Sequence, residues 1–325
     1  MVALIDQPLR LVLVGLGAFG REHLGRLLAR KDVVIVGVAD PSPAARNYVA
    51  VHYPSLQVET DSGSLLTATK PDGVIVATSA QSHFDITRKA LSLGIPVLLE
   101  KPVTPTASEA EQLAVMSEES GTFVLPGHVL RFSQDHCTVT DIVRSGGIGK
   151  LIYLCSRRYR DGDHAIRYTD DPVLTTLIHD IDLAVWLTQE PFRTVRSRRI
   201  GGPGFRSLTT ADLETVSGVH CHLRTAWIFD SGDLPPDRLE VVCDHGSVEL
   251  DVGVGLTLYA EGQAKTLPLV ASDDQLVNEH SYFLSEIRGS RKPRAVTMTD
   301  AVRGLKLADA ILEALRRGRE VDVVE

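Results

Sequence analysis

The sequence predicts an α/β protein in two parts: a doubly wound parallel sheet, followed by an α+β domain with a large open, mainly antiparallel sheet. Three observations lead to this fold class. In residues 1–127, short apolar runs alternate with helical patterns. One connection there is rich in glycine. After residue 127, segments with period-two alternation dominate. We therefore expect one domain over residues 1–127 and a second over 128–325, whose closing helix can pack back on the first.

The strands of the first half read as near-continuous Val, Ile and Leu runs, as in a parallel sheet covered on both faces. The expected strands are Leu9–Val14, Val33–Ala39, Leu56–Glu59, Gly73–Thr78, Pro96–Glu100 and Thr122–Pro126. The expected helices are Arg21–Arg30, Pro43–Val51, Gln81–Leu93 and Ser108–Glu119. Such a sheet binds ligands at the carboxyl ends of its strands.

The second half begins with a helix that ends at a pair of glycines, and it closes with two more helices. The expected order is a helix over Asp135–Ser145, the segment Lys150–Arg158, a polar loop, a helix over Thr175–Leu187, alternating segments at Glu214–Leu223, Thr225–Phe229, Arg238–Cys243, Ser247–Asp251 and Leu256–Tyr259, and helices at Gln275–Arg288 and Thr299–Arg317. Turns rich in Gly, Asp and Pro separate the alternating segments, which favours an antiparallel sheet.

The bulk composition excludes several classes of protein. The chain has 325 residues, 43% of them hydrophobic, which supplies a full core. Its formal net charge of −8 and 5% aromatic content argue against a nucleic-acid binder. No run approaches the 18 or more apolar residues of a membrane span, and no signal peptide is recognisable. The four cysteines are scattered, as in a cytoplasmic protein with reduced thiols.

A glycine-rich turn follows the first expected strand, and an acidic residue ends the next one. The turn reads Gly15-Leu16-Gly17-Ala18-Phe19-Gly20, and the acid is Asp40. Strand, glycine turn, helix, strand and acid is the order of a Rossmann-type dinucleotide-binding unit. Gly15 would allow the tight turn, Gly17 the approach of a pyrophosphate, and Gly20 close helix–strand packing. The alternative is a turn that merely ends a strand.

Two further segments follow strands of the first half. Glu100-Lys101-Pro102 ends the fifth strand, so Lys101 stands where the nicotinamide end of a dinucleotide would lie and could stabilise charge on a substrate oxygen. Glu100 and Lys101 are both expected to contact the cofactor as well. The alternative for Lys101 is an exposed lysine at a strand end. Thr78, Ser79 and His83 follow the fourth strand and could line the cofactor groove, although Ser79 is equally suited to cap a helix.

The second half holds candidates for proton transfer. His179 and Asp182 are spaced i, i+3 and would share a helix face, so the carboxylate could orient a histidine that accepts a hydroxyl proton. The alternative is that Asp180 or Asp182 is a first-turn acid favoured by the helix dipole. His128 at the domain junction could face a cleft or be a satisfied core histidine. His220 and His222 lack a third ligand, so no metal site is expected.

Together these pieces resemble the glucose-fructose oxidoreductase / inositol dehydrogenase / MocA family of NAD(P)-dependent oxidoreductases. The resemblance is carried by Gly15–Gly20, Asp40, Thr78–His83, Glu100-Lys101-Pro102, Gly127–Phe132, His179–Asp182 and the closing pattern Asp300–Leu315. It implies a nucleotide-binding domain, a C-terminal sheet domain whose open face often forms oligomers, and Lys101 and His179 beside the reacting carbon.

The chain departs from the family pattern at two positions. Family members commonly carry an aspartate four residues before the histidine, where this chain has Thr175. A hydroxyl can bind substrate but supplies no charge. Ser79 stands where proline is usual, which we expect to be a mild change.

The resulting expectation is hydride transfer between nicotinamide and a secondary alcohol carbon of a sugar, polyol or related small molecule. His179 would take the hydroxyl proton, Lys101 would hold the oxygen, and Asp182 would tune His179. The expected substrate-binding residues are Thr175, Asp180, His128 and Arg167. The alternatives are an NAD-dependent glycoside hydrolase without net redox change and a non-catalytic dinucleotide sensor that binds a protein partner.

Three expectations concern ligands and partners. Asp40 would accept hydrogen bonds from the adenosine ribose and repel a 2′-phosphate, which favours NAD over NADP. Arg46 could offset the repulsion, but it falls about two turns into the next helix, so its side chain could point away. Arg157, Arg158, Arg160 and Arg167 permit an acidic substrate, or are surface arginines. Glu214–Phe229 could give a sheet face that buries against another copy in a homodimer or homotetramer.

Overall fold

A computed structural model describes residues 7–168, 170–202, 206–230, 232–270, 273–290 and 295–323. The chain divides into two compact units, the first formed by Met1–Gly127 with Leu276–Thr299 and the second by His128–Gln275 with Asp300–Glu325. The first unit thus draws on two stretches of chain far apart in the sequence.

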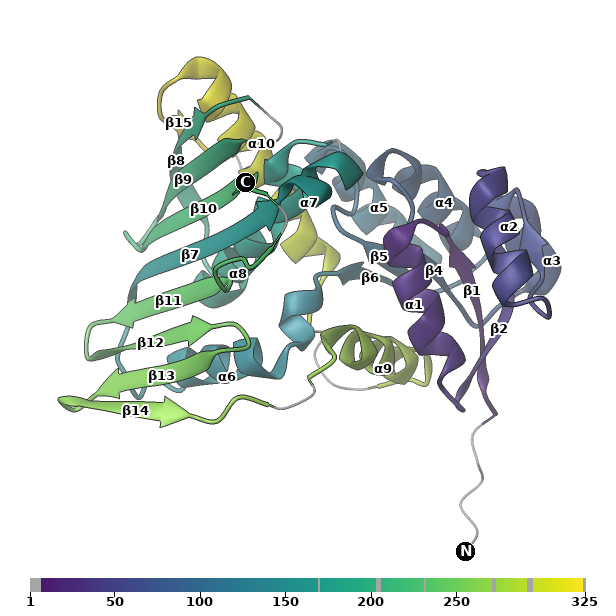
Figure 1. Cartoon of the computed structure of the whole chain (residues 1–325), viewed down its shortest axis with the longest axis horizontal. Helices are drawn as coiled ribbons and strands as arrows, with labels where there is room; N and C mark the ends of the chain where they lie inside the picture. The colour runs from purple at the N-terminus through teal and green to yellow at the C-terminus, as the bar shows by residue number, and fades with distance from the viewer. Residues whose placement is uncertain are drawn as a thin grey trace, which may run out of the picture. The chain divides into compact units, whose positions relative to one another are not determined.

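The first unit is built on a six-stranded sheet in the order β3-β2-β1-β4-β5-β6. Every pair in it is parallel, which is the doubly wound arrangement that the sequence predicts. The strands are β1 (Leu9–Val14), β2 (Val33–Ala39), β3 (Val58–Glu59), β4 (Gly73–Val76), β5 (Val97–Glu100) and β6 (Val124–Gly127). The helices are α1 (Ala18–Leu28), α2 (Pro43–His52), α3 (Ser62–Thr69), α4 (Ala80–Ser92), α5 (Ala107–Ser120) and α9 (Gln275–Ile287) (Figure 1).

The core of this unit lies on both faces of the sheet, because β4, β5 and β6 are buried along their length. Helix α9 supplies part of the covering. A Cβ at Gly73 on β4 would lie 2.7 Å from the Ile287 side chain and 3.1 Å from Phe283. The Phe283 ring also lies 5.9 Å from the ring of Phe123. Gly73 therefore lets α9 approach the sheet closely.

Helix α3 was not expected from the sequence. Its eight residues have Asp61 as the N-cap, whose side chain accepts a hydrogen bond from the Ser64 amide. Only Leu65 and Leu66 are buried, so the helix carries too few apolar residues for a helical period to stand out.

The second unit is built on a nine-stranded sheet in the order β14-β13-β12-β11-β7-β10-β9-β8-β15, counted over the described part of the chain. Only β7 and β10 pair in parallel, so the expected open and mainly antiparallel sheet is confirmed. The strands are β7 (Leu151–Asp161), β8 (Phe192–Ile200), β9 (Ser207–Thr215), β10 (His220–Phe229), β11 (Arg238–Cys243), β12 (Gly246–Asp251), β13 (Gly255–Ala260), β14 (Gln263–Leu267) and β15 (Val321–Asp322).

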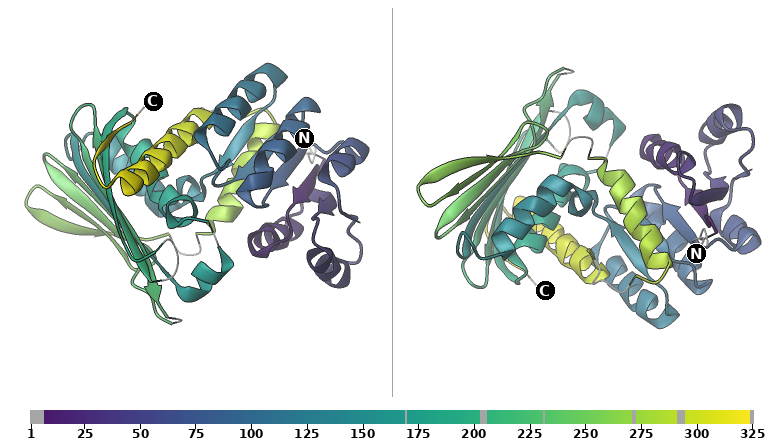
Figure 2. Two further views of the ribbon diagram at one scale, coloured as in Figure 1. Left: turned by 90° about the horizontal axis from the view of Figure 1, so that it is seen from above. Right: turned by 90° about the horizontal axis from the view of Figure 1, so that it is seen from below.

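Helices cover one face of this sheet. They are α6 (Gln134–Arg144), α7 (Gly162–Arg167), α8 (Ile178–Thr188) and α10 (Met298–Arg317), with short turns η1 (Val129–Phe132) and η2 (Val173–Leu177). Figure 2 shows the sheet edge-on, with α10 on one side of it and the other face bare. The Ser197 hydroxyl of β8 donates to the Ile311 carbonyl of α10 at 2.8 Å, which ties helix to sheet.

The expected strand over Glu214–Leu223 is wrong, because it spans the turn between β9 and β10. The buried positions remain odd-numbered on both sides of this turn, from Leu213 to Cys221. The reason is the register: His220 pairs with Glu214, so paired residues share parity and the alternation passes through the turn unbroken. Gly218, at φ +95°, makes the turn.

The polar loop expected after Arg158 is also wrong. Strand β7 continues to Asp161, whose side chain then caps α7 by accepting from the His164 amide at 2.9 Å. The strands β8 and β14 were likewise not expected. Strand β8 is rich in arginine and β14 is largely exposed, so neither shows a strong apolar alternation.

No helix in the described residues is long and apolar enough to cross a membrane. All four cysteines are free thiols.

Candidate functional site

The glycine turn of the first unit has the geometry that each glycine was expected to provide. Gly15 has φ +100°, and a Cβ on it would lie 2.3 Å from the Ala77 carbonyl oxygen. A Cβ on Gly20 would lie 2.0 Å from the Gly15 carbonyl oxygen. A Cβ on Gly17 would meet nothing within 4 Å. Two glycines therefore close the turn against the sheet, and the third leaves open space above it.

Helix α1 begins at this open position. Gly17 is its N-cap and offers no side chain to cap the helix, and Gly17 and Ala18 are exposed. The first amides of the helix, including those of Ala18 and Phe19, are thus not covered by a capping side chain. Free helix N-terminal amides beside open space fit the pyrophosphate of a dinucleotide.

Asp40 follows β2 and is held by the backbone around the turn. Its Oδ2 accepts from the Leu16 amide at 2.7 Å, and its Oδ1 accepts from the Ser42 amide at 2.8 Å. Each carboxylate oxygen retains acceptor capacity, so the group can also take ribose hydroxyl protons. These contacts fix the carboxylate at the edge of the turn.

Arg46 does not point away from Asp40, contrary to the possibility raised by its position in α2. Its Nη1 donates to the Asp40 and Pro41 carbonyl oxygens, both at 2.8 Å. The long side chain reaches back along the first turns of the helix, as arginine side chains do when carbonyl acceptors lie nearby. Its charge is therefore held close to the Asp40 backbone.

The segment after β4 is arranged by internal hydrogen bonds. Ser79 is the N-cap residue of α4, although its side chain makes no capping bond, and it is exposed. The Ser82 hydroxyl donates to the Thr78 hydroxyl at 2.8 Å. Thr78 is half-buried, so Thr78 and Ser79 both remain accessible at the carboxyl edge of the sheet.

His83 is buried and contacts two loops of the sheet edge rather than open space. Its Nδ1 lies 3.0 Å from the Pro102 carbonyl oxygen, and its Nε2 lies 3.2 Å from the Thr78 carbonyl oxygen. Burial lowers the pKa of His83, so the neutral ring donates through one nitrogen, and the shorter contact to Pro102 is the better candidate. The ring thus joins the segments that follow β4 and β5, and the expectation that it lines the cofactor groove is replaced by this indirect role.

Lys101 directly follows β5, and its backbone is held on both sides. The Lys101 amide donates to Glu100 Oε2 at 3.1 Å. On the other side, the Pro102 carbonyl oxygen accepts a hydrogen bond from the His83 ring. The Lys101–Pro102 peptide bond is cis. Glu100 itself is only 4% exposed, so its carboxylate is committed to the protein interior and does not face a cofactor.

In the second unit, the expected helix over Thr175–Leu187 has two parts. Residues Val173–Leu177 form a π-helical turn, and α8 follows from Ile178. Such turns insert one residue into a helix and are frequent at functional sites. Thr175 lies in this turn, 7% exposed, with its hydroxyl donating to the Asp171 carbonyl at 3.2 Å. His179 lies in the first turn of α8.

Asp182 is held by an arginine that the sequence did not point to. Arg131 Nη2 donates to Asp182 Oδ1 at 2.7 Å, and Arg131 Nε lies 3.0 Å from both carboxylate oxygens. His128 Nδ1 lies 3.7 Å from Asp182 Oδ1. Burial lowers the pKa of Arg131, but the charges of Asp182 and Asp300 outweigh it and raise that pKa. The carboxylate expected to serve His179 is therefore committed to a buried ion pair, which makes its influence on His179 indirect.

Asp180 is likewise committed. Arg158 Nε donates to Asp180 Oδ2 at 3.0 Å, and Arg158 Nη1 donates to Asp237 Oδ2 at 2.5 Å. Burial raises the pKa of Asp180 against the opposing charge of Arg158. Asp180 is 1% exposed. The expectation that it contacts substrate is not supported by this geometry, because both oxygens face Arg158.

The arginines proposed as an anion site are mostly neutralised. Arg158 and Arg160 both contact Asp237, and Arg157 donates to the Pro236 carbonyl at 3.0 Å. Arg167 differs from the other three arginines, because it is exposed at the end of α7. The cluster therefore gives little reason to expect an acidic substrate.

His220 and His222 share one carboxylate on the bare sheet face. His222 Nδ1 lies 2.7 Å and His220 Nε2 3.4 Å from Asp212 Oδ1. Within the described ranges, no group of three or more His, Cys, Asp or Glu side chains is placed to hold a metal ion.

Comparisons with known proteins agree with this geometry. The profile "Oxidoreductase family, NAD-binding Rossmann fold" matches residues 9–128, and the "GFO/IDH/MocA C-terminal domain" matches residues 136–249. An inositol 2-dehydrogenase of Burkholderia multivorans is 30% identical over 254 residues, covering 74% of each chain. The rhizopine catabolism protein MocA of Rhizobium meliloti is 28% identical over 320 residues, covering 95% of each.

The fold is also shared with a solved structure of scyllo-inositol dehydrogenase from Lactobacillus casei with bound NAD(H) and scyllo-inositol. It superposes with a TM-score of 0.84 at 17% identity, covering 98% of this chain and 100% of that one.

This protein belongs to the GFO/IDH/MocA family of oxidoreductases. It is an NAD-dependent dehydrogenase that acts on CH–OH groups of sugar or polyol type, as the sequence predicted. The two alternatives, a glycoside hydrolase and a non-catalytic sensor, find no support among these relatives.

Proposed function

We propose that this dehydrogenase oxidises a secondary alcohol of a cyclitol, with inositols as the first candidates. The observation that carries the proposal is the Lys101 segment at the carboxyl edge of β5, where Glu100 and His83 hold the backbone on both sides of the lysine. The inositol 2-dehydrogenase relatives support the substrate class.

The catalytic roles follow from the chemistry of the side chains. His179 accepts the hydroxyl proton as the C–H bond gives up a hydride and the C=O bond forms. Lys101 donates a hydrogen bond to the same oxygen and stabilises its charge. Bound NAD supplies the hydride acceptor. Asp182 acts on His179 only through the arrangement of α8, since Arg131 takes its carboxylate.

The first unit would hold the cofactor, and the second the substrate. Gly15, Gly17, Ala18, Phe19 and Gly20 present the open helix terminus, with Asp40, Thr78 and Ser79 at the same edge of the sheet. On the substrate side, Thr175 and Arg167 are the direct candidates. Asp180 and His128 are buried, Asp180 against Arg158 and His128 near Asp182, so we do not propose that either contacts substrate.

The threonine at position 175 changes which substrate group we expect to bind there. Its hydroxyl replaces the family's usual aspartate, so the site has one negative charge fewer where substrate hydroxyls bind. A threonine hydroxyl can accept or donate, whereas a carboxylate only accepts. Because the Thr175 hydroxyl donates its one proton to the Asp171 carbonyl, its oxygen is left to accept a hydrogen bond from a substrate hydroxyl, and we expect this bond to be weaker than one to a carboxylate.

A substrate panel tests the proposal. Purified protein with NAD is offered inositols, aldoses and ketoses, alditols and aldonic acids, and NADH formation is followed by absorbance. Turnover of at least one inositol above the other classes supports the proposal. Turnover restricted to open-chain substrates contradicts the cyclitol assignment and leaves the dehydrogenase class intact.

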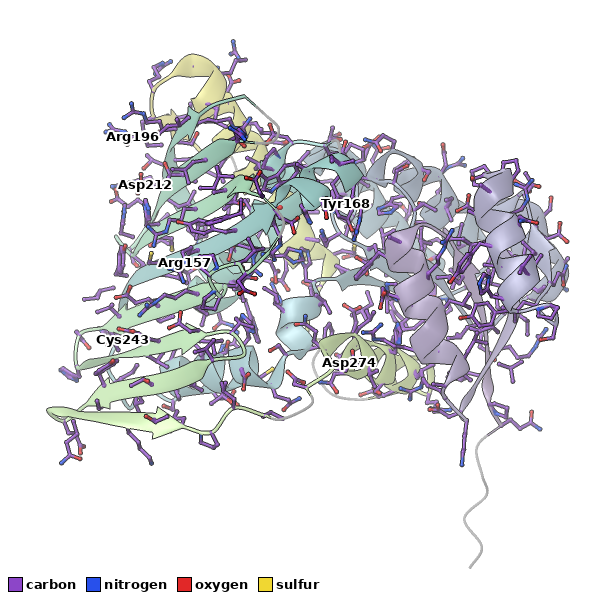
Figure 3. All side chains as sticks on the ribbon, in the orientation of Figure 1. Arg157, Tyr168, Arg196, Asp212, Cys243 and Asp274 are labelled. Carbon is purple, nitrogen blue, oxygen red and sulfur yellow. The ribbon has the colours of Figure 1, made fainter. Side chains whose placement is uncertain are left out.

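We also propose that the protein works in the cytoplasm as a homodimer or homotetramer through the bare face of its large sheet. That face carries charged and polar side chains from several strands, among them Arg157 on β7 and Asp212 on β9 (Figure 3). Many of them pair with each other, as His222 does with Asp212, which leaves a flat face able to meet its own copy. Sedimentation equilibrium at micromolar concentration tests this: a dimer or tetramer supports the proposal, and a monomer contradicts it.

A further inference from the structure

Four ionisable side chains lie together inside the first unit, and the proposed reaction uses none of them. His23 lies on α1, Glu100 ends β5, and Glu279 and His280 are neighbours on α9. All four are 4% exposed or less. Burying ionisable groups destabilises the folded protein unless the groups are paired, so we examine what pairs these four.

Three of the four form a continuous chain of hydrogen bonds that ends at Lys101. His280 Nε2 lies 2.8 Å from His23 Nδ1. His23 Nε2 lies 3.0 Å from Glu100 Oε1. Glu100 Oε2 accepts from the Lys101 amide at 3.1 Å. The chain thus connects α9 and α1 to the backbone of the proposed catalytic lysine.

The positions of the protons follow from what each nitrogen faces. His280 Nδ1 is buried and has no hydrogen-bond partner within the described part of the chain, so it carries no proton. His280 therefore donates from Nε2 to His23 Nδ1, and His23 donates from Nε2 to Glu100. Burial lowers the pKa of His280 to about 2, which keeps its ring neutral, so that hydrogen bonds are donated from His280 to His23 and from His23 to Glu100.

Glu279 does not compete with Glu100 as an anion. Both of its carboxylate oxygens are buried without a partner among the described residues. Burial, and the charge of Glu100, raise the pKa of Glu279 well above its usual value. Glu279 is therefore neutral, and Glu100 is the single negative charge of the cluster.

The carboxylate of Glu100 occupies space that a side chain on the neighbouring strand would otherwise fill. Gly127 on β6 is paired with Glu100, and a Cβ on Gly127 would lie 3.1 Å from Glu100 Oε1. The missing side chain leaves the room that the carboxylate occupies. A carboxylate fits here because it can accept from two donors, His23 at Oε1 and the Lys101 amide at Oε2.

We propose that His280, His23 and Glu100 form a directed hydrogen-bond chain that holds a carboxylate against the Lys101 amide and so positions Lys101 for the reaction. This inference rests on the proposed role of Lys101. His280, His23 and Glu100 are positioning residues, because none of them contacts substrate in this scheme. Through them, the packing of α9 on the sheet is linked to the position of the lysine.

The proposal also predicts an effect on the Lys101 side chain. A neighbouring anion favours the ammonium form of a lysine, so loss of the Glu100 charge should make Lys101 easier to deprotonate. The other charged or titratable groups that act on the cluster are Arg26 on α1, Arg30 just after the end of α1, and His83 on α4. They are unchanged in the variants below.

The first test measures Lys101 directly and needs no turnover. In the full chain with NAD bound, the rate at which acetic anhydride labels Lys101 is followed against pH by mass spectrometry, for the wild type and for Glu100→Gln. The amide places an NH₂ group toward one of the two donors, so one hydrogen bond is lost as well as the charge. A labelling midpoint about one pH unit lower in Glu100→Gln supports the proposal. An unchanged midpoint overturns it.

The second test uses a matched pair at position 280. Glutamine can place its NH₂ group near the position of the histidine Nε2 and donate to His23, whereas leucine cannot. We expect His280→Leu to lower kcat on the order of ten-fold with NAD affinity unchanged, since a displaced catalytic group loses rate before binding. His280→Gln should recover most of this loss. Equal kcat values for the two variants overturn the proposal.

A third variant separates positioning from general loss of packing. Leu284 lies one turn further along α9 and is 1% exposed. Leu284→Ala should lower the melting temperature through a cavity while leaving the Lys101 labelling midpoint in place. A midpoint that shifts equally in Leu284→Ala would show that any damage to α9 has the same effect, and would refute the specific chain. If the wild type oxidises no polyol, the proposed function fails, but the labelling result still decides this inference.

Discussion

The guanidinium of Arg131 forms an ion pair with both oxygens of the Asp182 carboxylate inside the second unit, with Nη2 2.7 Å from Oδ1 and Nε 3.0 Å from both oxygens. Both side chains are almost completely buried. Arg131 also contacts Asp300 at the start of α10, so it joins η1, α8 and α10. An aspartate that looked like the partner of a catalytic histidine is first of all part of the packing of this unit.

Asp182→Asn should strongly destabilise the protein. The amide cannot balance the buried Arg131 charge, and breaking one side of a buried ion pair costs about 3–5 kcal/mol. Chemical denaturation monitored by circular dichroism measures the change. The matched control is Asp85→Asn, which removes an exposed partner of Arg88 and should have no measurable effect. Similar losses in both variants would contradict the assignment of Asp182 to the core.

Three glycine variants separate folding from cofactor binding. Gly20→Ala should destabilise the fold, because its Cβ would lie 2.0 Å from the Gly15 carbonyl oxygen. Gly15→Ala should do the same, since φ is +100° there. Gly17→Ala, in open space at φ −64°, should keep its melting temperature and bind NAD more weakly. Calorimetry of unfolding and of NAD binding checks the contrast, and a Gly17→Ala protein with unchanged NAD affinity would contradict the proposed phosphate position.

His179→Asn should lower kcat by about 10²–10⁴-fold, the usual contribution of a general base, and Lys101→Met by about 10²–10³-fold, the usual effect of removing a donor that stabilises charge on an oxygen. NAD affinity should change little in His179→Asn, since that residue belongs to the second unit. Lys31→Met, an exposed lysine before β2, is the control and should leave turnover intact. The proposed roles fail if both active-site variants keep wild-type turnover on the true substrate.

Asp40→Ser should relax the preference for NAD over NADP by removing the charge that repels a 2′-phosphate. The side chain of Arg46, held at the Asp40 and Pro41 carbonyls, then becomes a nearby positive charge for that phosphate. Titration of both cofactors by fluorescence measures the ratio of affinities. Glu118→Ser, at an exposed position of α5, should leave the ratio unchanged. Tighter binding of NADP than NAD in the wild type would overturn this reading.

The pH dependence of stability should report Glu279. Its pKa in the folded protein is raised well above the usual 4.5, so between the two values the unfolded chain releases a proton that the folded chain keeps. This contribution to stability is fully present below pH 4.5 and is lost as the pH rises.

Glu279→Gln removes this titration, so its stability should fall less steeply than that of the wild type as the pH rises above 4.5. Urea denaturation at a series of pH values measures both slopes. The surface variant Glu118→Gln should retain the wild-type slope. Parallel slopes for Glu279→Gln and the wild type would show that Glu279 ionises normally in the folded protein.

Local sequence was sufficient for the features that are defined by neighbours along the chain. The glycine turn, Asp40 and Lys101 were predictable because a strand end, a tight turn and a helix start are specified by adjacent residues. The prediction of one strand around Glu214 failed because residues paired across the hairpin are both even-numbered or both odd-numbered. The apolar alternation therefore continues through the turn, and the sequence does not show where the chain reverses.

The sequence by itself thus determined the family, the two-part fold class and the order of the elements in the first unit apart from α3, whereas α7, β8 and β14 of the second unit were missed. Only the tertiary structure decided the partners of the buried charges: Arg131 for Asp182, Arg158 for Asp180, and His23 for Glu100. These partners lie 51, 22 and 77 residues apart. A buried carboxylate needs a donor, but any of many donors satisfies the local sequence, and the choice is made by which elements the packing brings together.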